Sequence, residues 1–210
     1  MGRFFNYDSP VFQALGKVID MIFLNLLVVL SSIPLVTIGA AQAALYDVTE
    51  KMMRNEGTVW ASYWAAFRSN FKQATAQWLI LAVLGVFCGW GLLVCVVSQA
   101  PGRALILAAL IIQMVVLLSV YSWTFPMQSR FLNPFHRTLR NALLCSLLYL
   151  PRTLVIVVTN ALPLVVLLLD PLRFLTFFPL WILLWFSLSA YLHWKLLKKP
   201  FAYLENLVAT

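Results

Sequence analysis

The chain has 210 residues, of which 62% are hydrophobic and 10% are charged, and its formal net charge is +8. Soluble globular domains average roughly 45–50% apolar and about 25% charged residues, so one core of this size could not bury so much apolar surface. The composition excludes an ordinary soluble protein. It predicts an all-α, polytopic helical membrane protein with a single integral membrane domain over residues 1–210.

Two apolar segments follow the polar start of the chain. No small-residue cleavage site follows residues 1–10, so we expect no removable signal peptide and a first span, residues 18–35, that stays as an anchor. After a turn marked by Pro34, residues 38–53 predict a second, marginal span. The alternative is that residues 18–53 cross once and then lie along the membrane surface, which gives five spans instead of six.

Residues 59–76 have the pattern of an amphipathic helix. Aromatic residues recur at steps of three and four, at Trp64, Phe67 and Phe71, whereas Arg68 and Lys72 fall elsewhere on the helical wheel. A basic face opposite aromatic residues is typical of a helix in the headgroup layer. This segment is therefore predicted either as an elbow that follows the membrane surface or as a docking surface for another protein.

Residues 78–97 and 104–125 predict the clearest spans, because each has about the 20 uncharged residues needed to cross the hydrocarbon. The short connection between them predicts a helical hairpin. Gly85 and Gly89 form a GxxxG pair that permits close helix packing, and we expect their neighbour to lie within the chain. Small residues in the second segment offer further close-packing faces: Gly39, Ala40, Ala43 and Ala44.

Residues 133–149 predict a second, weaker amphipathic helix. Asn133 is a plausible N-cap before a proline, and Phe135 and Leu139 lie away from Arg137 and Arg140. The same two interpretations apply as for residues 59–76. Two further spans follow at residues 154–169 and 174–194.

The basic residues give the orientation. In the six-span arrangement 13 of the 15 Lys and Arg residues lie on one side, and in the five-span arrangement 11 do. Because short cytoplasmic loops are enriched in Lys and Arg, the C-terminus is predicted to be cytoplasmic in both. This distribution also accounts for the net charge, so we expect no nucleic acid partner.

No catalytic, cofactor or metal motif is present, so we expect no enzyme activity and no cofactor. His193, beside a tryptophan and a lysine, is expected at the membrane interface. The three cysteines, Cys88, Cys95 and Cys145, are expected as buried free thiols.

Four amides lie within predicted spans and are candidates for an intramembrane polar site: Asn25, Gln42, Gln113 and Asn160. Pro163, one turn after Asn160, is a candidate helix break of the kind that transporters use at a binding site. The alternative is that these amides only hold helices together by hydrogen bonds.

Several motifs resemble the YesL-like family of bacterial integral membrane proteins. They are residues 33–41 (IPLVTIGAA), 44–46 (ALY), 67–74 (FRSNFKQA), 141–144 (NALL) and 150–153 (LPRT). The resemblance runs over nearly the whole chain. It implies a small multi-pass plasma-membrane protein associated with carbohydrate ABC importers, without a catalytic site.

Two functions are therefore expected as alternatives. The first is a non-catalytic accessory subunit that docks on the permease subunits of a carbohydrate ABC importer through its basic amphipathic helices. The second is a small secondary transporter in its own right. Membrane lipids are expected partners in both, and self-association is a further alternative.

Overall fold

The computed structural model describes residues 10–98 and 102–209, and this part of the chain is helical, without strands. The elements in chain order are α1 (Pro10–Ser32), the 3₁₀-helix η1 (Leu35–Thr37), α2 (Ile38–Arg54), α3 (Val59–Val97), α4 (Arg103–Arg130), α5 (Phe135–Leu148), α6 (Leu150–Leu169), α7 (Pro171–Thr176), α8 (Phe178–Leu180), the π-helix η2 (Trp181–Trp185) and α9 (Phe186–Ala209). The predicted all-α membrane fold is confirmed.

Five segments of the described chain are long and apolar enough to cross a membrane: Leu15–Ser32, Val59–Val97, Arg103–Arg130, Leu150–Leu169 and Phe178–Asn206. Helix α2 is not among them. It contains Asp47, Glu50 and Lys51, and the helices around it, rather than lipid, cover most of its surface. The residues predicted as a marginal second span therefore form a helix that is buried in protein.

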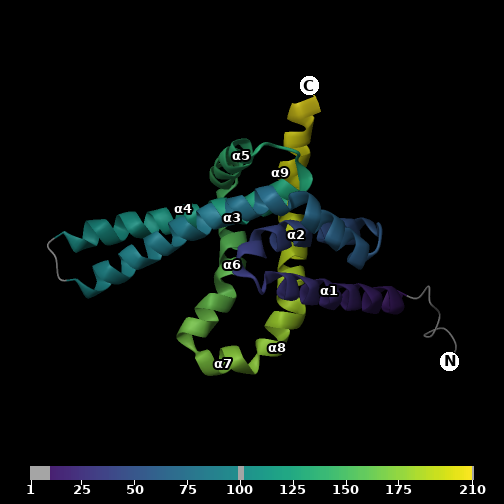
Figure 1. Ribbon diagram of the computed structural model, residues 1–210, viewed down its shortest axis with the longest axis horizontal. Coiled ribbons are helices and arrows are strands. Elements are labelled where there is room, and N and C mark those ends of the chain that lie inside the picture. The colour runs from purple at the N-terminus through teal and green to yellow at the C-terminus, as the bar shows by residue number, and fades with distance from the viewer. Residues whose placement is uncertain (1–9, 99–101, 210) are drawn as a thin grey trace.

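Helices α1 and α2 form an antiparallel hairpin through the turn at η1 (Figure 1). Lys17 and Asp20 of α1 line one cavity together with Lys51 of α2 and Gly57 of the following loop. The start of α1 therefore lies at the same end of the molecule as the end of α2.

Small residues allow α2 to sit at the centre of the fold. Ala40, Ala43 and Ala44 are fully buried, which confirms the predicted close packing of this segment. A Cβ atom on Gly39 would overlap the carbonyl oxygen of Ala74 in α3. The α2–α3 crossing is therefore close enough that only glycine fits at this position.

Helix α3 is one continuous helix of 39 residues, roughly 58 Å long at about 1.5 Å per residue. It unites the predicted amphipathic segment, residues 59–76, with the predicted span, residues 78–97. No turn or loop separates these segments, because the helix is uninterrupted from Val59 to Val97. The amphipathic half of α3 instead continues directly into the apolar half as one helix.

The apolar half of α3 pairs with α4 in a long hairpin that extends from the centre of the molecule (Figure 1). Cys88 Sγ lies 3.2 Å from the Leu110 carbonyl oxygen within this pair. Gly85 and Gly89, however, have no atom within 4 Å of an added Cβ, apart from their own helix and chain neighbours. The expectation that another part of the chain packs against the GxxxG pair is therefore wrong.

The last predicted span, residues 174–194, is interrupted. Pro171 and Pro179 begin the short helices α7 and α8, and η2 follows before α9. A π-helix frees backbone groups from the usual ladder. Asn25 of α1 satisfies two of them, because its Nδ2 donates to the Ile182 carbonyl oxygen at 3.0 Å and its Oδ1 accepts from the Ser187 N–H at 2.6 Å.

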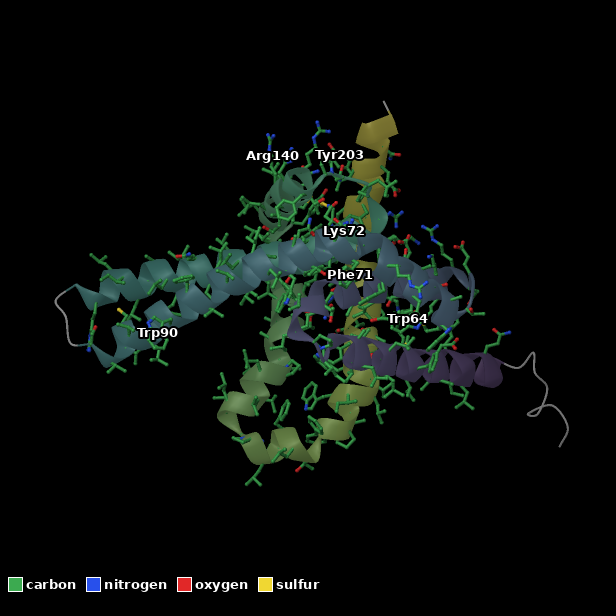
Figure 2. The ribbon with its side chains drawn as sticks, viewed as in Figure 1. Trp64, Phe71, Lys72, Trp90, Arg140 and Tyr203 are labelled. Atoms are coloured by element: carbon green, nitrogen blue, oxygen red, sulfur yellow. The ribbon has the colours of Figure 1, made fainter. Side chains whose placement is uncertain are left out.

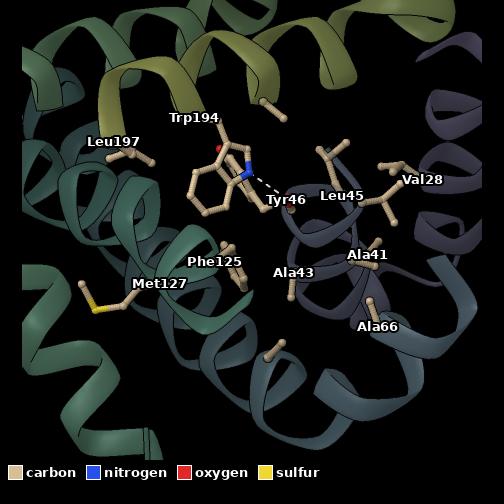
Figure 3. Packing of buried hydrophobic residues seen from close by; sticks show 14 of the residues in the cluster. Val28, Ala41, Ala43, Leu45, Tyr46, Ala66, Phe125, Met127, Trp194 and Leu197 are labelled. Carbon is tan, nitrogen blue, oxygen red and sulfur yellow. Dashed lines mark hydrogen bonds between the residues drawn. The ribbon is translucent and has the colours of Figure 1, made fainter. Parts of the chain in front are cut away.

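The core lies where α2, α3, α4 and α9 meet (Figure 3). The indole N–H of Trp194 in α9 donates to the carbonyl oxygen of Tyr46 in α2 at 2.7 Å. Phe201, on the same face of α9, packs edge-on against Trp194 and Trp123. These contacts hold the C-terminal helix against the α1–α2 hairpin.

Candidate functional site

Two regions contain the residues that the sequence indicates as functional, and the first is a basic surface on α3 and α5. Its four basic residues, Arg68, Lys72, Arg137 and Arg140, are exposed and form no ion pair with any described residue. Figure 2 shows Lys72 on α3 and Arg140 on α5. We call these four residues the basic surface.

A hydrogen-bond network holds the two halves of the basic surface together. Gln73, next to Lys72, donates through Nε2 to Gln128 Oε1 at 2.6 Å and to the Asn133 carbonyl oxygen at 2.9 Å. Gln128 Nε2 in turn donates to Asn70 Oδ1 at 3.1 Å. Thr138, next to Arg137, is fully buried beside this network. The two predicted amphipathic helices, far apart in the sequence, therefore form one braced surface.

The aromatic residues of α3 differ in their exposure. Trp64 and Phe67 are half-buried and pack against the core beside Tyr63. Phe71 is exposed and continues their row of ring contacts to the surface beside Lys72 (Figure 2). Of the three aromatic residues predicted to dock on a partner or on lipid, Phe71 is thus the one whose ring is exposed.

The second region is a cavity of about 90 Å³ between α2, α4, α6 and α9. Two of the four predicted amides, Gln42 and Asn160, line it together. The remaining lining residues are Leu45, Tyr46, Tyr121, Pro163, Trp185, Phe186 and Ser189. Asn25 instead braces η2, and Gln113 is exposed on the α3–α4 hairpin. The predicted polar site is therefore divided among three places.

His193 lies behind this cavity and is fully buried. Its Nδ1 is 2.9 Å from the hydroxyl oxygen of Tyr46, and its Nε2 is 2.6 Å from Thr159 Oγ1. The expectation of an interfacial histidine is wrong, because packing of α9 against α2 and α6 covers the ring. A lone histidine between two uncharged groups links three helices, and no carboxylate orients it as a base.

An ion-pair cluster was not predicted from the sequence. Arg130 at the end of α4 donates through Nη1 to Glu50 of α2 and through Nε to Glu205 of α9, both at 2.6 Å. Its guanidinium also lies 5.5 Å from the centre of the Trp194 ring. These charges lie 75 and 80 positions from Arg130, so only the folded chain brings them together.

The remaining side chains that could react or bind a metal ion are the cysteines and the carboxylates. Cys88, Cys95 and Cys145 are buried free thiols, as predicted. Burial raises the pKa of Cys145 to about 11. Among the described residues no group of three or more His, Cys, Asp or Glu side chains could hold a metal ion.

Residues 21–92, about a third of the chain, match the family described as "Protein of unknown function, DUF624". This is a family of uncharacterised, typically bacterial membrane proteins. No curated protein matches the chain, and no solved structure matches it. The matched residues comprise the second half of α1, all of α2 and α3 through Leu92, and therefore the α3 half of the basic surface.

Proposed function

We propose that the protein is a non-catalytic membrane subunit that docks on another membrane complex through the basic surface of α3 and α5. The observation that carries this proposal is the bracing of that surface by Gln73 and Gln128. Side chains that only attract anionic lipid need no fixed geometry. A surface whose two halves are held together by partly buried amides suits recognition of a partner of defined shape.

The partner class is a carbohydrate ABC importer, and the bacterial plasma membrane is the proposed location, with the C-terminus cytoplasmic. The support for both is the resemblance of the motifs in residues 33–46 and 67–74 to the YesL-like family. The charge of the basic surface suits an acidic patch on the cytoplasmic side of the importer. Phe71 supplies an exposed aromatic ring beside it, as is common at the centre of protein interfaces.

The test is copurification of the full-length protein from native membranes with mass spectrometry. Replacing Arg68, Lys72, Arg137 and Arg140 by Gln should leave insertion and folding intact and remove the importer subunits. A matched control replaces four other exposed basic residues, Lys17, Lys195, Lys198 and Lys199, by Gln and should retain them. Retention of the permease and nucleotide-binding subunits by the basic-surface variant would refute the docking proposal.

A small secondary transporter is the second candidate. What favours it is the cavity that Gln42 and Asn160 line together, because polar groups that face a cavity between spans can hold a substrate. The helix break predicted at Pro163 is absent, since α6 continues through this residue. Purified protein alone in liposomes should then accumulate substrate along an ion gradient. Flux that requires an ATP-hydrolysing partner would instead favour the accessory subunit.

A further inference from the structure

The cavity between α2, α4, α6 and α9 is lined by polar groups that the protein leaves unpaired. Among the described residues, no hydrogen-bond partner exists for the Gln42 amide, the Tyr121 hydroxyl or the Trp185 indole N–H. Asn160 uses Nδ2 on Ser122 Oγ, at 3.3 Å, and leaves its Oδ1 without a partner in this part of the chain. Donors and acceptors from four elements therefore line the same cavity with unused capacity.

Unpaired polar groups of this kind are costly at the centre of a membrane protein, since no bulk water replaces the missing bonds. Elsewhere in the described chain Asn25 braces η2, and Gln73 and Gln128 brace α3 against α4 and α5, whereas the amide of Gln77 in α3 is buried without a partner. Unlike Gln77, Gln42 and Asn160 border an open volume, so a molecule separate from the chain can reach their unpaired groups.

The lining defines the chemistry of that molecule. No Asp, Glu, Lys, Arg or His side chain lines the cavity, so a charged ligand would lack a counter-charge. Tyr46, Tyr121, Trp185 and Phe186 supply aromatic surface for C–H groups, while the amides suit hydroxyl groups. A volume of about 90 Å³ is well above the roughly 10–15 Å³ needed for one water molecule, so the cavity can hold several waters or one small molecule.

We propose that this cavity is a binding site for a small uncharged polyol of three or four carbons. Its hydroxyl groups donate to Asn160 Oδ1 and Gln42 Oε1 and accept from Tyr121 and Trp185, and its C–H faces lie against the aromatic rings. The site is independent of the basic surface, so failure of the docking proposal does not remove it.

The test uses full-length protein purified without glycerol and reconstituted in nanodiscs. Binding of radiolabelled glycerol is measured by equilibrium dialysis, with erythritol as competitor and glycerol 3-phosphate as the charged counterpart. We expect saturable glycerol binding, competition by erythritol, and at least tenfold weaker competition by glycerol 3-phosphate. Absence of saturable glycerol and erythritol binding would mean that water alone fills the cavity and would overturn the proposal, as would equal competition by glycerol 3-phosphate.

Two substitutions remove cavity groups without removing any bond within the protein. Gln42→Leu and Tyr121→Phe should fold normally and weaken glycerol binding at least tenfold. The matched control is Gln113→Leu, the same change at an exposed amide outside the cavity, which should bind like the unmodified protein. Unchanged binding in both cavity variants would overturn the proposed site. If Gln42→Leu does not fold, Tyr121→Phe decides alone, because it keeps the ring and its packing.

Discussion

At the scale of single residues, the fold depends on a few side chains that connect distant helices. Arg130 joins the ends of α2, α4 and α9, and its side chain is only 20% exposed. Removing Arg130 takes the ion-pair partner of Glu205 and one of the two partners of Glu50, which keeps Arg54. Loss of a partner from a partly buried ion pair costs more than the pair itself contributes.

We therefore expect Arg130→Gln to lower the free energy of unfolding by about 1–3 kcal/mol, measured by thermal denaturation in detergent. The control is Arg173→Gln, because Arg173 pairs with Asp170 while its side chain is 78% exposed, and a loss below about 1 kcal/mol is expected there. Adding Glu50→Gln to Arg130→Gln should restore part of the stability. Equal losses in the Arg130 and Arg173 variants would contradict a structural role for the cluster.

The glycines offer a second contrast at this scale. Gly39→Ala places a Cβ on the backbone of α3 and should destabilise the protein by about 1–3 kcal/mol or prevent insertion. Gly85→Ala has open space and gains helix propensity, so it should be neutral or stabilising by up to about 1 kcal/mol. Melting temperatures of the two variants provide the comparison. Destabilisation by Gly85→Ala would show that a neighbour covers that face.

Cys145 provides a test of the packing of α5. Its raised pKa of about 11 keeps the thiol protonated at pH 8, where roughly one molecule in a thousand carries the reactive thiolate. Maleimide should therefore label Cys145 only after denaturation. Alkylation of this residue in the folded protein at pH 8, detected by peptide mass spectrometry, would show that α5 separates from the core.

At the scale of elements, the continuity of α3 is the main departure from the sequence-based expectation. Spin labels at Ala65 and Phe87, both exposed, should lie roughly 33 Å apart along a straight helix, measured by pulsed electron spin resonance after replacement of the native cysteines. A right-angle elbow near residue 77 would bring them to about 23 Å, by the same rise per residue.

The sequence predicted the location of most helices because the apolar runs are long and clusters of basic residues separate them. It did not predict that residues 59–76 and 78–97 form one helix, since no local signal separates a bend from a straight continuation. It also grouped Asn25 with Gln42 and Asn160, although Asn25 serves the backbone of η2. A single sequence contains no pattern that identifies a π-helix, so Asn25 could not be assigned to the backbone of η2.

At the scale of the whole molecule, the α1–α2 hairpin predicts on which side of the membrane the N-terminus lies. The end of α2, the loop at Gly57 and the ends of α4 and α9 gather around the Arg130 cluster and its adjoining cavities. Tags at the N-terminus, near Gly57 and after Thr210 should therefore all report the cytoplasm, whereas an insertion at Pro101 should report the outside. An N-terminal tag outside would contradict this hairpin and restore the single-crossing alternative.

Because α3 runs unbroken from the basic surface to the tip of its hairpin, it can act as a lever. Its backbone at Ala74 lies directly against Gly39 of α2, and this contact would serve as the fulcrum. From there to Val97 the rod extends for roughly 35 Å, so a swing of about 5° moves the tip by roughly 3 Å. Contact made at Lys72 would thus displace the tip at the opposite side of the membrane without any change of secondary structure.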